Sequence, residues 1–213
     1  MEEKEQESVK ITLGRVQLEG LLGIPKNAKS VILFAHGSGS SRFSSRNNFV
    51  AKELRRASFG TLLFDLLTEA EDRTYENRFD IQLLSNRLSH TTEWTLANDE
   101  TKSLRVGYFG ASTGAAAALQ ASTTFAPGTI AAIVSRGGRP DLALKYLGNV
   151  TAPTMLIVGG NDEDVIHLNK VAYDRMTCKK RMEIVPGATH LFEEPGTLDE
   201  VARLAVEWFT KFL

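Results

Sequence analysis

The feature that most constrains this chain is a regular alternation between short, uninterrupted apolar runs and longer stretches of helical periodicity. A strand that is buried on both faces has to be apolar throughout, so each run is typical of a central strand in a parallel sheet. The stretches between the runs place their apolar residues on one side of a helix. This alternation predicts an α/β fold, with a mostly parallel twisted sheet and helices on both faces. The runs are residues 31–35, 61–64, 106–109, 130–134, 154–158 and 182–185, and helices are expected over residues 47–56, 79–96, 113–121, 168–176 and 198–212.

The N-terminal part of the chain has a different pattern. Residues 9–13 and 16–21 alternate between apolar and polar side chains, and a Gly-Arg turn joins them. This pattern indicates an antiparallel hairpin at the start of the sheet. Residues 1–8 are acidic and polar, and we expect them to form a disordered arm. A length of 213 residues is typical of one domain, so we expect a single domain over residues 1–213, with no large cap domain and an open site.

Composition excludes several classes of function. The 25 basic and 26 acidic residues give a net charge of −1, whereas a nucleic-acid binder needs many unopposed Lys and Arg side chains. No apolar run approaches the roughly 20 residues of a membrane span, and the N-terminus lacks the apolar region of a secretory signal. The single cysteine, Cys178, cannot form an internal disulfide, which fits a reducing compartment. We therefore expect a cytoplasmic protein that binds neither nucleic acid nor membrane.

A Gly-x-Ser-x-Gly motif centred on Ser112 follows one of the apolar runs and precedes an Ala-rich helix. A sharp strand-to-helix turn of this kind holds a nucleophile in a strained backbone conformation. Gly110 and Gly114 remove side chains that would collide at the turn, and the positive end of the following helix favours an oxyanion. The alternative is a simple helix cap, since serine is a preferred N-cap residue. Ser112 is the candidate nucleophile.

A serine nucleophile needs a base to take its proton, and the chain has four histidines. We expect His36 to end an early strand, His90 to lie inside a long helix and His167 to begin a helix. His190 lies in a loop after the last expected strand, and it follows Ser112 in the chain order of nucleophile, acid and base for this type of sheet. His190 is therefore the candidate base.

The acid that orients the base should lie in the loop after the run at 154–158. This loop contains three carboxylates, Asp162, Glu163 and Asp164. Asp162 comes first after the turn glycines, where its side chain can face back over the strand ends. Asp164 is the main alternative, although it is also placed to cap the next helix. We predict Asp162 as the acid and keep the other two carboxylates as alternatives.

An oxyanion formed at Ser112 needs two backbone N–H donors. The first should come from Thr113, the residue after the nucleophile, and the second from the glycine-rich loop after the first central strand. Gly37 and Gly39 allow the backbone of this loop to contact a substrate, and we expect the Ser38 N–H to be the second donor. The alternative is a phosphate-binding loop, but the loop lacks the lysine and the glycine spacing of those motifs.

Four segments together resemble the α/β-hydrolases, and more narrowly the dienelactone hydrolase group. They are HGSGSSR at 36–42, GYFGASTGAAAAL at 107–119, VGGNDEDV at 158–165 and PGATHLF at 186–192. Four motifs in this one order are far more specific than any one alone, and the resemblance covers roughly residues 21–212. It implies the α/β-hydrolase fold.

The resemblance implies a catalytic triad of Ser112, His190 and Asp162, with the Thr113 and Ser38 amides around the oxyanion. The implied reaction is hydrolysis of a small soluble carboxylic ester, lactone or thioester through an acyl-enzyme, without a metal or an organic cofactor. The founding dienelactone hydrolases use a cysteine nucleophile, whereas the single cysteine of this chain lies far from the motif. This departure favours an ordinary serine esterase reaction.

Substrate contacts are expected from loops over the strand ends. Residues 66–78 are mostly polar or charged and form either a short lid, with Tyr75 against the substrate, or a solvated loop. Arg136 or Arg139 is placed to meet a substrate carboxylate. The alternative is a pair of solvated arginines or an ion pair with Asp141.

Two other functions fit the same residues. An acyltransferase would use the same triad, because both reactions pass through an acyl-enzyme. A non-catalytic ligand-binding protein can also be built on this fold, although a binding module does not need a serine, a histidine and an acid together. We expect a monomer or a homodimer whose partner is a small-molecule ester.

Overall fold

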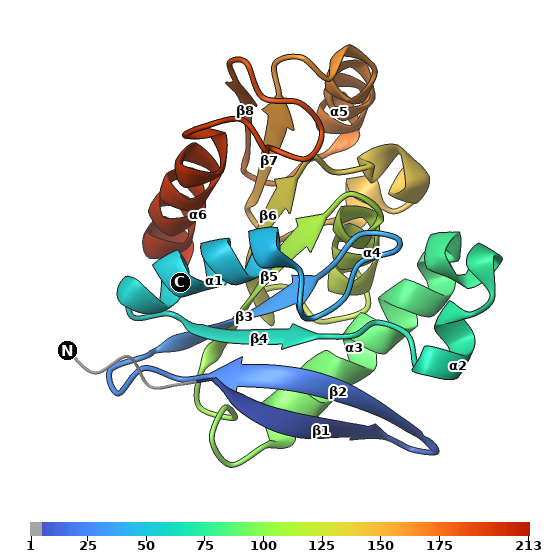
Figure 1. Cartoon of the computed structure of the whole chain (residues 1–213), viewed down its shortest axis with the longest axis vertical. Helices are drawn as coiled ribbons and strands as arrows, with labels where there is room; N and C mark the ends of the chain where they lie inside the picture. The colour runs from blue at the N-terminus through green and yellow to red at the C-terminus, as the bar shows by residue number, and fades with distance from the viewer. Residues whose placement is uncertain (1–5) are drawn as a thin grey trace.

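The computed structural model describes residues 6–213, and within them the strands form one sheet in the order β1-β2-β4-β3-β5-β6-β7-β8. β1 pairs with β2 and β2 pairs with β4 in antiparallel fashion, whereas the remaining neighbours are parallel (Figure 1). The predicted α/β fold with an N-terminal antiparallel hairpin is confirmed. The strands are β1 (Glu7–Leu13), β2 (Val16–Gly23), β3 (Ser30–Ala35), β4 (Gly60–Phe64), β5 (Arg105–Ala111), β6 (Ile130–Arg136), β7 (Thr154–Gly159) and β8 (Lys180–Val185).

Helices cover both faces of this sheet (Figure 1). α1 and α6 pack together on one face, and α3, α4 and α5 lie on the other. Within residues 6–213, no helix combines the length and the apolar character that crossing a membrane requires. The helices are α1 (Ser45–Arg56), α2 (Glu69–Asp72), α3 (Ile81–Ala97), α4 (Thr113–Ser122), α5 (Glu163–Arg175) and α6 (Thr197–Phe212), with short 3-10 helices η1 (Tyr75–Phe79), η2 (Pro140–Ala143) and η3 (Leu147–Asn149).

The sheet separates two apolar cores, one under each helical layer. Every residue of β3, β4, β6 and β7 is buried, because both faces of these strands are covered by helices. The apolar runs predicted this burial for these strands, but the run at 182–185 lies in β8 at the edge of the sheet, where Val185 alone is buried. The carboxyl ends of the parallel strands therefore form a firmly packed edge, and the loops that follow them are held in fixed places.

Several boundaries differ from the prediction by one or two residues, and the start of α5 and the start of β1 bear on earlier expectations. α5 begins at Glu163 rather than near residue 168, so His167 lies inside this helix and not at its start. Acidic residues in the first turn of a helix interact favourably with its positive end, which explains the earlier start. At the N-terminus, Glu7 and Ser8 belong to β1 and pair with β2, whereas we expected them in a disordered arm. Residues 1–5 of that predicted arm lie outside the described residues.

Residues 66–78, expected as a lid or a solvated loop, fold into α2 and η1. A capping box starts α2: the Thr68 hydroxyl accepts from the Glu71 N–H over 3.2 Å, and the Glu71 carboxylate accepts from the Thr68 N–H over 2.9 Å. Glu71 also forms an ion pair with Arg87 of α3. The charged residues of this segment thus make local bonds that fasten it to the body of the fold.

Candidate active site

Ser112 lies on the turn between β5 and α4, at the carboxyl edge of the sheet. Its backbone has φ 51° and ψ −121°, a conformation that is strained for a residue with a side chain. The Ser112 N–H donates to the Arg136 carbonyl over 3.3 Å, and the Arg139 N–H donates to the Ser112 carbonyl over 3.1 Å. These two bonds to the end of β6 and the loop after it hold the strained turn.

Two glycines allow the chain to turn this sharply. A Cβ atom on Gly114 would lie 2.1 Å from the carbonyl oxygen of Ala35 in β3. A Cβ atom on Gly110 would lie 2.5 Å from the Cα of Ala115. Both distances are far shorter than van der Waals contact, so α4 can pack this closely against the strands only with glycine at these positions. The predicted role of the motif glycines is the one observed.

A chain of hydrogen bonds joins Ser112, His190 and Asp162, which come from the ends of β5, β8 and β7. The Ser112 Oγ and His190 Nε2 atoms are 3.3 Å apart, and the His190 Nδ1 and Asp162 Oδ2 atoms are 2.7 Å apart. A carboxylate can only accept a hydrogen bond, so Nδ1 carries the proton of the neutral imidazole. Nε2 is then free to accept the proton of the serine hydroxyl.

Of the three carboxylates in the loop after β7, Asp162 is the one that faces the histidine. Asp162 is the N-cap residue of α5, yet its side chain makes no capping bond and instead meets His190. Glu163 and Asp164 lie in the first turn of α5, and both are exposed. The helix start therefore separates the first carboxylate from the other two.

The loop that carries His190 is held on both sides of the histidine. Thr189 donates to the Glu194 carboxylate twice, from its hydroxyl over 2.6 Å and from its N–H over 3.1 Å. The Thr189 hydroxyl is the main reason why the pKa of Glu194 lies below its usual value. Phe192, with φ 56°, is buried in the core beneath the loop. No motif marks Glu194 in the sequence, and its role became visible only in the structure.

The backbone at Gly37 and Ser38 lies beside the candidate nucleophile. A Cβ atom on Gly37 would lie 3.1 Å from the Ser112 Cβ, so the loop after β3 passes directly against the serine. Among the residues that the structure describes, the N–H groups of Ser38 and Thr113 donate to no other backbone carbonyl. Both groups are therefore available to a substrate oxygen.

His36 fastens this loop from below. Its Nε2 accepts from the Leu66 N–H over 3.0 Å, and its Nδ1 lies 2.9 Å from the Gly37 carbonyl oxygen. Nδ1 thus carries the proton and donates it to Gly37. Burial lowers the pKa of His36 below its usual 6.5, which keeps the ring neutral at pH 7 and suits it to one accepted and one donated bond.

The structure corrects the expectation for Arg136. Its side chain is only 5% exposed, and its guanidinium donates to the Asn47 side-chain oxygen over 3.1 Å. The guanidinium carbon lies 5.8 Å from the centre of the Phe192 ring. Burial, and secondarily the charge of Arg46, lowers the pKa of Arg136 to about 10. The arginine points into the layer of α1 and α6, so it is closed to a substrate carboxylate.

The other two expected substrate contacts have different surroundings. Arg139 makes two hydrogen bonds to the carboxylate of Asp141, over 2.9 and 2.8 Å, which is the ion pair that the sequence left as the alternative. Tyr75 of η1 is 64% exposed, and its ring lies 5.1 Å from that of Phe79. Neither side chain lies in the hydrogen-bond chain around Ser112.

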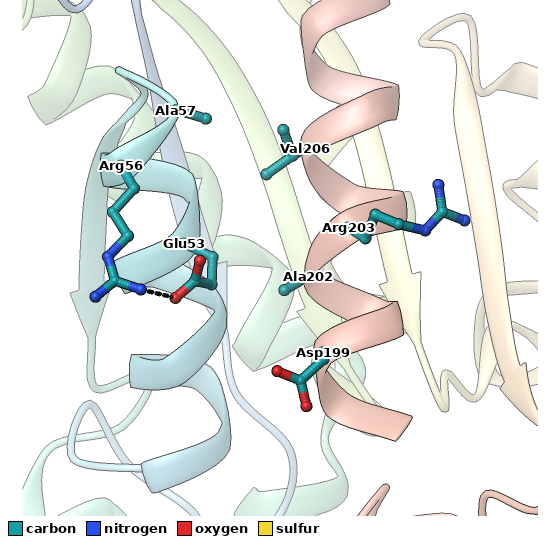
Figure 2. A pocket seen from close by; sticks show the side chains of 7 residues that line it. All are labelled: Glu53, Arg56, Ala57, Asp199, Ala202, Arg203 and Val206. Carbon is teal, nitrogen blue, oxygen red and sulfur yellow. Dashed lines mark hydrogen bonds and ion pairs between the residues drawn. The ribbon is translucent and has the colours of Figure 1, made fainter. Parts of the chain in front are cut away.

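A wide groove elsewhere on the molecule lies between α1 and α6 (Figure 2). It has a volume of about 430 Å³, and Arg56 on its wall is paired with Glu53 over 2.6 Å. The groove is lined from the two helices alone, so Ser112 and His190 take no part in it. The residues that line the groove are Glu53, Arg56, Ala57, Asp199, Ala202, Arg203 and Val206.

Within residues 6–213, no group of three or more His, Cys, Asp or Glu side chains is arranged to hold a metal ion.

Comparison with known proteins identifies the family. The sequence pattern of the dienelactone hydrolase family matches residues 18–213. The chain belongs to the dienelactone hydrolase family. A crystal structure of dienelactone hydrolase from Anabaena variabilis has a TM-score of 0.97 and 51% identity, with 100% of both chains covered. Est1E from Butyrivibrio proteoclasticus has a TM-score of 0.81 at 14% identity, and the match covers 96% of this chain and 98% of Est1E. At this identity the similarity concerns the fold only.

Two curated relatives of this family member carry a different name. They are proteins of two Mycobacterium tuberculosis strains, each named "Putative phosphoribosyl transferase", and each is 53% identical over 207 residues. The match covers 97% of this chain but 46% of each relative. The chain thus spans about half the length of these relatives. Their name therefore belongs to proteins of which roughly half lies outside the match.

Proposed function

We propose that this member of the dienelactone hydrolase family is a serine hydrolase that cleaves small carboxylic esters, or the related lactones and thioesters. The observation that carries the proposal is the unbroken chain of hydrogen bonds from Asp162 through His190 to Ser112, with the serine on a strained turn. Strain of this kind persists only where surrounding groups enforce it, and it gathers at functional sites.

The first half of the proposed reaction forms an acyl-enzyme. His190 Nε2 takes the hydroxyl proton while Ser112 Oγ forms a bond to the carbonyl carbon of the ester. The negative charge that develops on the carbonyl oxygen is stabilised by the Thr113 and Ser38 N–H groups and by the positive end of α4. His190 then donates its proton to the leaving oxygen as the carbon–oxygen bond breaks, and Asp162 stabilises the transient imidazolium.

The second half releases the acid. Water gives a proton to His190 and attacks the acyl carbon, and the proton returns to Ser112 as its bond to the acyl group breaks. An acyltransferase would differ only in this half, with an alcohol or a thiol in place of water. We favour hydrolysis because the family is one of hydrolases.

The name of the Mycobacterium relatives suggests a second class of reaction, the transfer of a phosphoribosyl group. Such a transfer takes place at a sugar carbon, and an acyl-enzyme on Ser112 has no place in it. The hydrogen-bond chain therefore favours ester hydrolysis over that transfer for this chain.

Labelling with a fluorophosphonate tests the proposal, because this reagent reacts with an activated serine. We expect an adduct on Ser112, located by mass spectrometry, and hydrolysis of p-nitrophenyl acetate that the labelling abolishes. The Ser112→Ala variant should show neither. Absence of an adduct on the folded wild-type protein would contradict the proposal. Ester formation with added alcohol, in place of acetate release, would identify an acyltransferase instead.

A further inference from the structure

A narrow cleft lies against the loop that contains Gly37 and Ser38. The loop after β3 forms one wall, and the residues that follow β4 form the opposite wall, with α2, η1 and α3 completing the lining. Gly37, which lines the cleft, also passes directly against Ser112, so one residue of the lining lies next to the candidate nucleophile. The lining residues are His36, Gly37, Ser38, Gly39, Leu66, Leu67, Asp72, Arg78 and Leu84.

The order of the strands decides which part of a substrate faces this cleft. The sheet runs β4-β3-β5-β6-β7-β8, so Ser112 at the end of β5 has the cleft on the β3 and β4 side. His190 and Asp162 follow β8 and β7, on the other side. His190 has to reach the leaving oxygen in order to protonate it. The leaving group therefore lies toward β6 to β8, and the acyl group points toward the cleft.

The size of the cleft limits the acyl group. Its volume is about 10 Å³, which is roughly the space that one water molecule needs. Leu66, Leu67 and Leu84 are buried around it, and the glycines on the opposite wall have no side chains that could swing aside. A single methyl group fills a space of this size, whereas a longer chain would collide with the leucines.

The charges at the cleft cancel each other. The Arg78 guanidinium donates to both carboxylate oxygens of Asp72, over 2.9 and 2.8 Å, and to the Asp72 carbonyl oxygen over 2.8 and 3.1 Å. His36 is neutral, because burial lowers its pKa. The cleft is thus lined by apolar side chains and by an arginine whose charge is already paired with Asp72. This lining favours a neutral, apolar group over an anionic one.

We propose that this cleft is the acyl pocket of the enzyme and that the preferred substrates are esters of a neutral, acetyl-sized acid. The inference rests on the proposed serine hydrolase reaction and adds its substrate class. Leu67 and Leu84 set the limit on chain length, because both leucines are buried and line the cleft.

Truncation of a matched pair of leucines in α3 tests the inference. Leu84 lines the cleft, whereas Leu88 is one turn further along the same helix, equally buried and outside the lining. We would compare kcat/KM for p-nitrophenyl acetate, butyrate and hemisuccinate in wild type, Leu84→Ala and Leu88→Ala. Since both truncations remove core packing, Leu67→Ala serves as a second opening variant if Leu84→Ala does not fold.

We expect the wild type to prefer acetate over butyrate by about 10-fold or more, since one methylene in an apolar pocket changes the rate by roughly 10–200-fold. Hemisuccinate should be poorer still. Leu84→Ala or Leu67→Ala should raise the ratio of butyrate to acetate kcat/KM by about 10-fold or more, and Leu88→Ala should leave this ratio unchanged.

Three results would overturn the acyl pocket while leaving the serine hydrolase intact. They are a wild-type preference for butyrate or hemisuccinate, an unchanged ratio in both opening variants that still react with the fluorophosphonate, or an equal change in Leu88→Ala. Failure of the wild type to react with the fluorophosphonate is a different outcome, because it contradicts the proposed function and the pocket with it.

Discussion

Ser112 keeps its strained backbone because its neighbours leave it no alternative. The carbonyl of Arg136 and the N–H of Arg139 hold its peptide groups from one side, and the closely packed glycines hold the turn from the other. His190 is likewise held by a neighbour, through the hydrogen bond between its Nδ1 and the carboxylate of Asp162. At the scale of single residues, the geometry of the candidate site therefore depends on groups other than Ser112 and His190 themselves.

Replacement of Asp162 tests this dependence. In Asp162→Asn the amide can donate to Nδ1, so the imidazole is held in the tautomer whose Nε2 carries the proton and cannot accept one from Ser112. We expect kcat for p-nitrophenyl acetate to fall by about 10⁴-fold. Asp164→Asn is the matched control, because this exposed carboxylate lies two residues away, and its kcat should stay at the wild-type value. A larger loss in Asp164→Asn than in Asp162→Asn would show that the acid has been assigned wrongly.

At the scale of elements, the packing of α4 against β3 decides whether the turn can form. α4 is buried along its whole length, and its first turn lies against the backbone at Ala35 and His36. The same contact points the positive end of the helix at the site. A helix with a side chain at position 114 would stand further from the sheet and would carry Ser112 away from His190.

The variant Gly114→Ala should therefore destabilise the protein. Its Cβ would meet the Ala35 carbonyl oxygen at 2.1 Å, and relief of this clash requires a shift of the helix. We expect the free energy of unfolding in urea to fall by about 3 kcal/mol.

Gly148→Ala is the control, since a Cβ there meets nothing within 4 Å. It should change the free energy of unfolding by no more than about 0.5 kcal/mol. Equal stability of the two variants would contradict the close-packing argument.

At the scale of the whole molecule, the sheet gathers loops from distant parts of the chain at one edge, and a buried histidine joins two of them. His36 bonds the loop after β3 to the Leu66 N–H after β4. Burial lowers its pKa below 6.5, so the folded protein resists a proton that the unfolded chain accepts. This side chain thus contributes a pH dependence to the stability of the fold.

The sign of this dependence follows from the lowered pKa. Below about pH 6.5 the unfolded chain binds a proton at His36 that the folded protein does not, so the free energy of unfolding falls as the pH drops. The contribution is fully present above pH 6.5. We expect urea unfolding between pH 7.5 and pH 5 to show this loss in the wild type and a smaller loss in His36→Gln.

The glutamine side chain of His36→Gln can still accept a hydrogen bond, but it does not titrate. His90→Gln controls for the removal of an exposed histidine. If His36→Gln and the wild type lose the same stability over this pH range, His36 is not the group responsible.

The sequence alone determined the class of fold and nominated two candidate residues of the site from their order along the chain. Uninterrupted apolar runs predict strands that are buried on both faces, and periodic stretches predict the helices between them, because both signals are local. The carboxyl ends of parallel strands share one edge, so chain order alone was enough to nominate Ser112 and His190 for one site. The spacing of Thr68 and Glu71 was also a readable capping box, but the charge of that segment suggested a loop.

Only the tertiary structure decided which side chains face one another. Asp162, Glu163 and Asp164 are equivalent in charge, and the start of α5 separated the first from the other two. Arg136 comes after the predicted run at 130–134, yet it is the last residue of β6 and its side chain is buried beside Asn47. The leucines of the cleft come from the segment after β4 and from α3, and no local pattern relates them. Distances through space set these outcomes, and a sequence records only distances along the chain.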